Sequence, residues 1–183
     1  VPRPMNKKVI AFVMLAAASC SNGRDGDWFP APDGFVWPAR VTKQPAKDEQ
    51  VRVADMPEAL RNYVAKQWEP QPLPEFIHAR RADLNGDGVA EWFIDIPILG
   101  GTGGCFYEII TQTTKGLRSL GGIQGGFHLC VPVKGEKWLQ IEGSSRAGGG
   151  DMTRYLMQFR KTEYINVRSE VHDYNVGKAT VGK

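Results

Sequence analysis

The stretch Asp83-Leu84-Asn85-Gly86-Asp87-Gly88-Val89-Ala90-Glu91-Trp92 joins a run of oxygen-bearing side chains to the start of a β-rich segment. Carboxylate or amide oxygens recur at every second position at the start of this stretch. A hard cation such as Ca²⁺ takes about six to eight oxygen ligands, and one tight turn can supply most of them. Glycines allow such a turn to adopt positive φ angles. The stretch therefore predicts a calcium loop, with these ligands: Asp83, Asn85, Asp87, the Val89 carbonyl and Glu91.

The residues after the loop read Trp92-Phe93-Ile94-Asp95-Ile96, which is a β-rich run and not a helix. Ile94 stands where an EF-hand loop places its bidentate Glu. The pattern D-x-N-x-D-G-x-x-E before a hydrophobic residue resembles the calcium loops of FG-GAP and VCBS-type repeats, over this loop and its strand alone. That resemblance implies bound Ca²⁺ and a loop that opens a β-strand. The alternative is a metal-free turn, because Asp, Asn and Gly favour turns in any case.

Everything after Pro74 has the short β-branched and aromatic runs and Gly-rich turns that are typical of β proteins. We therefore expect a mainly β fold, an antiparallel sandwich or a propeller-like domain, with one short N-terminal helix and a single globular domain over residues 55–183. The predicted strands are Phe76–Ala82, Trp92–Ile96, Phe106–Thr111, Phe127–Val133, Trp138–Glu142, Arg154–Arg160 and Tyr164–Ser169.

The helix is predicted at the start of that domain. Asp55-Met56-Pro57-Glu58 offers an N-cap Asp, a Pro in the first turn and a Glu at the third position. Apolar residues then recur at helical spacing as far as Pro70. They form the stripe Met56, Leu60, Tyr63, Val64 and Trp68.

The N-terminal region has the order of a secretory signal peptide: Lys7 and Lys8, then an apolar run, then small residues. The apolar run is shorter than the roughly 20 residues that a membrane-spanning helix needs. Ala17-Ala18-Ser19-Cys20 resembles a bacterial lipobox, although Ala17 stands where Leu is commonest. This resemblance implies a signal peptide over residues 1–19 and lipidation of Cys20. The alternative is ordinary cleavage after Ala18, which leaves Cys20 as a free thiol.

Lipidation would place the protein in the bacterial cell envelope, anchored in a membrane and facing the periplasm. Ser21, in place of an Asp after the lipidated cysteine, favours the outer membrane. Residues 20–54 are rich in Pro, Gly, Asp and Lys and predict a flexible tether. Aromatic residues are unusual in a solvated linker, so part of this segment is expected to dock on the domain. They are Trp28, Phe29, Phe35 and Trp37.

Of the three cysteines, lipidation of Cys20 leaves Cys105 and Cys130. An even pair in an oxidising compartment predicts a disulfide. It would close a loop of about 25 residues, for which the chain-entropy model gives about 3 kcal/mol. The spacing of these two cysteines does not match a C-x-x-C redox or zinc motif.

The 23 Lys and Arg exceed the 20 Asp and Glu by three, and three basic residues, Arg3, Lys7 and Lys8, precede the predicted cleavage site. The mature chain is therefore nearly neutral, which argues against a nucleic-acid partner.

Possible catalytic groups are scattered. The Gly-rich stretches lack the Gly-Lys-Ser/Thr ending of a phosphate loop, and the three histidines, His78, His128 and His172, have no ligand spacing and are expected to be strand or surface residues. We therefore expect a non-catalytic, calcium-stabilised periplasmic binding lipoprotein of the inhibitor, immunity or assembly type, with an envelope protein or a glycan as partner. The alternative is a periplasmic metal-dependent hydrolase in which Asp95 and Asp151 act as acid and base.

Overall fold

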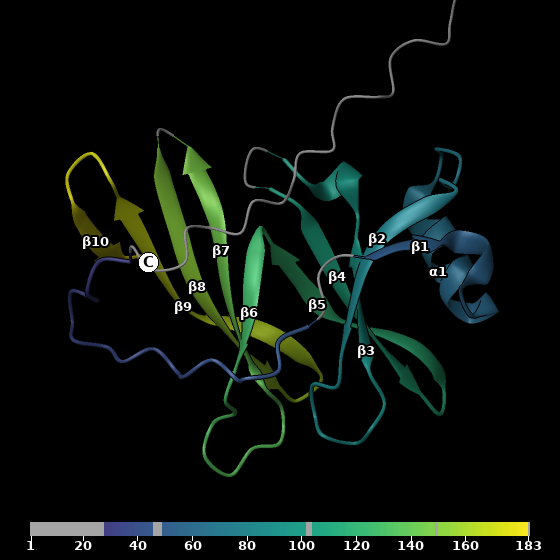
Figure 1. Ribbon diagram of the computed structural model, residues 1–183, viewed down its shortest axis with the longest axis horizontal. Coiled ribbons are helices and arrows are strands. Elements are labelled where there is room, and N and C mark those ends of the chain that lie inside the picture. The colour runs from purple at the N-terminus through teal and green to yellow at the C-terminus, as the bar shows by residue number, and fades with distance from the viewer. Residues whose placement is uncertain (1–27, 46–48, 102–103, 149, 183) are drawn as a thin grey trace, which may run out of the picture.

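The computed structural model describes residues 28–45, 49–101, 104–148 and 150–182, which form two five-stranded antiparallel sheets and one α-helix (Figure 1). In both sheets each strand pairs with its neighbour in sequence, so each sheet is a meander. The first sheet contains β1 (Glu49–Arg52), β2 (Phe76–Ala82), β3 (Glu91–Asp95), β4 (Phe106–Thr113) and β5 (Gly116–Gln124). The second contains β6 (Gly126–Cys130), β7 (Gln140–Gly148), β8 (Asp151–Arg160), β9 (Glu163–Asp173) and β10 (Lys178–Val181).

The mainly β prediction is confirmed, and the arrangement is sandwich-like and not a propeller. The core between the sheets is rich in aromatic residues. Phe93 of the first sheet stacks on Phe127 of the second with ring centroids 4.8 Å apart. Other buried members of this core are Leu84, Tyr107, Ile109, Leu120, Ile123, Leu129, Ile141, Tyr155, Met157 and Tyr164.

Helix α1 (Glu58–Trp68) covers the other face of the first sheet. Four of the residues in the predicted stripe, Met56, Leu60, Val64 and Trp68, are buried there against Ile77, Ala79, Ile94, Ile96 and Ile110. The predicted N-cap is wrong. Val53–Asp55 already forms a 3-10 turn, so the chain reaches the helix only at Glu58, with Pro57 in the N-cap position and no side-chain cap bond.

Tyr155 of β8 links the two sheets by reaching across Gly143 of β7 to Gln124, the last residue of β5. Its hydroxyl accepts a hydrogen bond from the Gln124 N–H (2.9 Å) and donates to the Gln124 carbonyl. The ring lies directly over Gly143, where an added Cβ would stand 2.2 Å from the Tyr155 Cζ. The bridge therefore depends on a glycine at position 143.

Residues 28–45, which we call the strap, lie across the outer face of the second sheet (Figure 1). At the edge strand β6 the strap pairs with the backbone: the Val41 N–H donates to the Leu129 carbonyl (3.0 Å) and the Val131 N–H to Ala39 (2.9 Å). The Gln44 side-chain amide continues this pairing, since its Nε2 donates to the Leu129 carbonyl (2.8 Å) and its Oε1 accepts from the Leu129 N–H (2.7 Å).

The tether predicted over residues 20–54 is corrected by this arrangement. Its aromatic part is docked, because two rings cover arginines of the sheet and two enclose His172, and residues 49–52 form strand β1. The globular domain therefore begins well before residue 55. Within the described ranges, no helix combines the length and apolar character needed to cross a membrane.

Candidate functional site

The predicted calcium loop is organised around the carboxylate of Asp83. Its Oδ1 accepts hydrogen bonds from the backbone N–H groups of Gly86 (2.7 Å), Asp87 (3.2 Å) and Asn85 (3.3 Å), and its Oδ2 accepts one from Gly88 (2.9 Å). Positive φ angles of 74° at Gly86 and 86° at Gly88 let the chain curl around this carboxylate. The loop is thereby held in shape by its own first residue.

Asn85 and Asp87 repeat the same kind of turn on the exposed side of the loop. The Asn85 Oδ1 accepts from the Asp87 N–H (2.8 Å), and the Asp87 Oδ1 accepts from the Val89 N–H (2.7 Å). The Asn85 Nδ2 also donates to the Asp87 Oδ2 (2.9 Å). Local Asx turns of this kind bring the side-chain oxygens of the loop close together.

The pKa of Asp83 reflects two opposed influences. Burial, the largest single one, raises it, but the four backbone N–H groups together outweigh burial and hold the pKa below its ordinary value. Asp83 is therefore ionised at neutral pH. Its carboxylate, together with the neighbouring amide and carboxylate oxygens, is the hard oxygen donor set that Ca²⁺ prefers.

Glu91, the remaining predicted ligand, is turned inward. It is 1% exposed, and its Oε2 accepts from the Leu84 N–H (2.8 Å) while its Oε1 accepts from the Thr111 hydroxyl (3.1 Å). Burial raises its pKa. The structure thus brings Asp83, Asn85, Asp87 and Val89 together in the loop, while Glu91 fastens the base of the loop to β4. In the part of the chain that is described, no three His, Cys, Asp or Glu side chains form a metal-holding cluster.

A second polar group lies on the outer face of the second sheet, beneath the strap. Glu142 of β7 is 3% exposed and receives Arg154 of β8 (3.0 Å) and Arg40 of the strap (3.1 Å). Burial is the largest influence on this carboxylate and raises its pKa, but the two guanidinium groups together bring the pKa below its ordinary value. One buried carboxylate thus joins two neighbouring strands to the strap.

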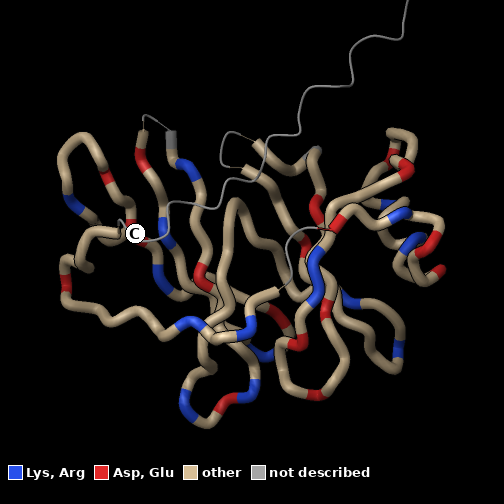
Figure 2. The backbone as a smooth tube through the Cα atoms, in the orientation of Figure 1, with Lys and Arg blue, Asp and Glu red and all other residues tan. Residues whose placement is uncertain are grey.

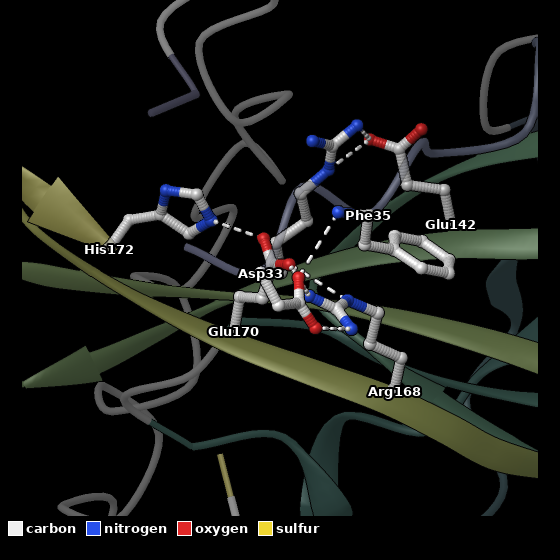
Figure 3. A network of polar contacts seen from close by, with 7 residues as sticks. Asp33, Phe35, Glu142, Arg168, Glu170 and His172 are labelled. Carbon is white, nitrogen blue, oxygen red and sulfur yellow. Dashed lines mark hydrogen bonds and ion pairs between the residues drawn. The ribbon is translucent and has the colours of Figure 1, made fainter. Parts of the chain in front are cut away.

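A similar group of charged residues lies nearer the start of the strap (Figure 3). Arg168 of β9 forms a two-pronged contact with Asp33, at 2.9 Å and 2.7 Å, and also contacts the fully buried Glu170. The hydrogen bonds from Arg168 are the main reason that the pKa of Asp33 is lowered. On the other side of Glu170, the Nε2 of His172 stands 3.4 Å from the Glu170 Oε2.

Aromatic side chains of the strap cover these charges. Trp37 lies over the Arg154 guanidinium (3.9 Å from the ring centroid) and Phe35 over that of Arg168 (4.1 Å). Such cation–π contacts gain strength where water is excluded. The sequence predicts docking of these aromatics but does not show what they cover, because the charged partners lie on two strands far away in sequence, Arg154 on β8 and Arg168 on β9.

The predicted disulfide between Cys105 and Cys130 is wrong. Cys130 is a free, buried thiol on the outer face, 3.9 Å from the Glu142 Oε2, whereas Cys105 packs against the core between the sheets. The Cys105 carbonyl accepts from the Gly125 N–H (2.6 Å), and Cys130 lies at the far end of β6 from Gly125. Five extended residues span about 16 Å, whereas bridged cysteines have Cα atoms about 4.4–6.8 Å apart.

The other predicted residues have simpler outcomes. Cys20 and the predicted signal peptide lie outside the described residues. Asp95 ends β3 in the first sheet and Asp151 begins β8 in the second. His78 is an exposed strand residue, as expected, but His172 is fully buried.

Comparison with known proteins does not assign the chain to a family: no family model, no curated protein sequence and no solved structure matches it.

Proposed function

We propose that this protein is a non-catalytic binding domain whose 83–89 loop takes up Ca²⁺ for stability, and that a lipid on Cys20 holds it on the periplasmic side of the bacterial envelope. The partner class is an envelope protein or a glycan. The observation that carries the proposal is the loop, in which an ionised Asp83 and the oxygens of Asn85 and Asp87 are gathered at the surface.

The ligands in this proposal are Asp83, Asn85, Asp87 and the Val89 carbonyl, with water completing the coordination. Glu91 is left out, because it is only 1% exposed and its carboxylate is turned into the fold, towards the Leu84 N–H and the Thr111 hydroxyl. Lacking the bidentate ligand of an EF-hand, the loop should bind Ca²⁺ with a Kd on the order of 10⁻⁴ M, as extracellular modules do.

A structural role for the metal is supported by where the loop lies. It connects β2 to β3, two neighbouring strands of the first sheet, and Leu84 within it is fully buried in the core between the sheets. Fixing the loop therefore also fixes the end of a strand pair and a core side chain. A binding role without nucleic acid is supported by the charges, because acidic and basic segments alternate over both sheets (Figure 2).

The test is calcium-dependent thermal unfolding of the mature protein. At ten times the Kd, Ca²⁺ should stabilise the fold by about 1.4 kcal/mol, which raises Tm by about 3–6 °C for a domain of this size. Mg²⁺ should have a smaller effect, because it gives up its water shell reluctantly.

The matched variants are Asp87→Ala, which removes a loop ligand, and Glu163→Ala, which removes an exposed carboxylate at the start of β9. The calcium-dependent rise should disappear in Asp87→Ala and persist in Glu163→Ala. If wild type and Asp87→Ala respond to Ca²⁺ alike, the loop is a metal-free turn. The anchor is tested separately, by labelling with a palmitate analogue, which should mark wild type and not Cys20→Ser.

A further inference from the structure

His172 is enclosed by the first residues of the strap. Its side chain has no exposed surface, the Trp28 ring meets it edge-on at 4.7 Å, and the Phe29 ring stacks on it at 6.0 Å. Tyr174 packs in turn on Phe29, at 5.2 Å. Among the described residues, neither imidazole nitrogen makes a hydrogen bond, and the Nε2 has the Glu170 Oε2 at 3.4 Å. A buried polar ring that makes no hydrogen bond is costly, and burial disfavours its charged form further.

Charged groups face this imidazole from two strands. Glu170 lies beside it on β9: the Glu170 Oε2 faces the His172 Nε2 at 3.4 Å, while the Oε1 accepts from Arg168, which also holds Asp33 of the strap. Arg154 on β8 lowers the pKa of His172, whereas Glu170 raises it. From β10, the residue opposite His172 is the uncharged Ala179, and the strap itself contributes the uncharged Trp28 and Phe29.

Burial is the main reason that the pKa of His172 lies below its ordinary value; Arg154 adds to this effect and Glu170 opposes it. The neutral ring is therefore the form that fits beneath the strap. When the strap end lifts, the ring meets water and its pKa returns towards about 6.5.

We infer that protonation of His172 releases the aromatic end of the strap, Trp28 and Phe29, from the second sheet. The device is separate from the calcium loop and goes beyond the proposed function. Protons bind more tightly to the open form than to the closed form, so acid shifts the population towards the open form. Above the pKa of His172 in the open form, about 6.5, protons do not weaken the closed form. As pH falls below this value, protonation of the open form makes the closed form progressively less favourable.

The change of the opening constant with pH follows from the binding of a single proton to His172. Between pH 7.5 and pH 5.5 the opening constant should rise about tenfold, provided that the closed form stays unprotonated over this range. Asp33 does not share this window, since its pKa is lowered by Arg168 and it remains ionised at pH 5.5. The Arg168 contact thus holds while the His172 contact weakens.

The experiment has two readouts on the mature chain. Histidine side-chain NMR gives the pKa of the His172 imidazole. Amide hydrogen exchange over the first residues of the strap, corrected for the intrinsic effect of pH, gives the opening constant of its aromatic end. We expect His172 to titrate below the ordinary imidazole value of about 6.5, and strap protection to fall about tenfold from pH 7.5 to pH 5.5.

Variants test the coupling in both directions. His172→Gln should remove the pH dependence of strap protection, whereas His78→Gln should retain it. Trp28→Ala with Phe29→Ala should raise the pKa of His172, because coupling between two events is reciprocal. Val36→Ala, at a strap residue that is 86% exposed, should leave that pKa unchanged.

Three results would overturn the inference. These are a His172 pKa at or above the ordinary value of about 6.5, strap protection that keeps its pH dependence in His172→Gln, and a His172 pKa that does not respond to removal of the two rings. Near-UV circular dichroism at each pH separates strap release from global unfolding, since Trp138 stacks on Phe159 (4.0 Å) inside the domain, away from the strap.

Discussion

Glu142 of β7 forms ion pairs with two guanidinium groups at once, that of Arg154 on the neighbouring strand at 3.0 Å and that of Arg40 on the strap at 3.1 Å. The carboxylate is almost completely buried, and Arg154 is largely so. Removing one partner of a buried ion pair leaves the other charge without compensation, which is more harmful than the pair itself is stabilising.

Glu142→Ala should therefore lower the free energy of unfolding by about 3–5 kcal/mol, measured by urea denaturation. The control is Arg52→Ala, which breaks an exposed ion pair with Glu75 at 3.0 Å. Exposed pairs contribute about 0–1 kcal/mol. Equal effects of the two substitutions would show that Glu142 does not support the packing of the strap.

The same carboxylate predicts a loss of stability in acid. Because its folded-state pKa is below the ordinary value, Glu142 stabilises the fold above the unfolded pKa of about 4.3, and this contribution disappears as pH falls through the folded pKa. Unfolding free energies measured between pH 6 and pH 3 should decline in wild type. Glu142→Gln should show a shallower decline, and parallel curves would refute the assignment.

Cys130 should be unreactive in the native protein. Burial is the main cause that raises the pKa of its thiol to about 12, and the nearby Glu142 adds to the effect. Since the thiolate is the reactive form, iodoacetamide should label the Cys130 peptide only after denaturation, without prior reduction. If Cys130 can be labelled in denaturant only after reduction, it is part of a disulfide.

Gly143→Ala should destabilise the sandwich, because the new Cβ would stand 2.2 Å from the Tyr155 ring. Overpacking of this kind costs about 1–3 kcal/mol, and it would also disturb the hydrogen bonds between Tyr155 and Gln124. Gly101→Ala, where the added Cβ meets nothing within 4 Å, is the matched control in thermal unfolding. A Gly143→Ala variant as stable as Gly101→Ala would mean that Tyr155 moves aside freely.

The sequence predicts strands well where side chains alternate and a turn is short. The segments that become β8 and β9 flank a two-residue turn, in which Lys161 has a φ of 57°, and both were predicted. β5 was not, because its glycines hide the pattern. Gly122 is there to make room for the Phe106 ring, which would come within 2.2 Å of an added Cβ, and this contact is visible only in the folded sheet.

The candidate sites show the same contrast between contacts that are local in sequence and contacts that form only in the folded chain. The 83–89 loop was predicted because its hydrogen bonds connect residues at most five positions apart. The network beneath the strap was not, because Arg40 and Glu142 are 102 residues apart in sequence and their pairing depends on the docked strap. The Cys105–Cys130 prediction failed for a related reason: counting cysteines says nothing about which face of a strand each occupies.

The amide of Gln44 has a consequence for how this protein behaves at high concentration. A strand laid along β6 would present a fresh row of N–H and C=O groups on its far side, and another molecule could add to that row. A side-chain amide pairs with Leu129 in the same manner but has no backbone continuing behind it. Together with the backbone contacts of Ala39 and Val41, Gln44 therefore occupies groups at the edge of β6 that an incoming strand would need.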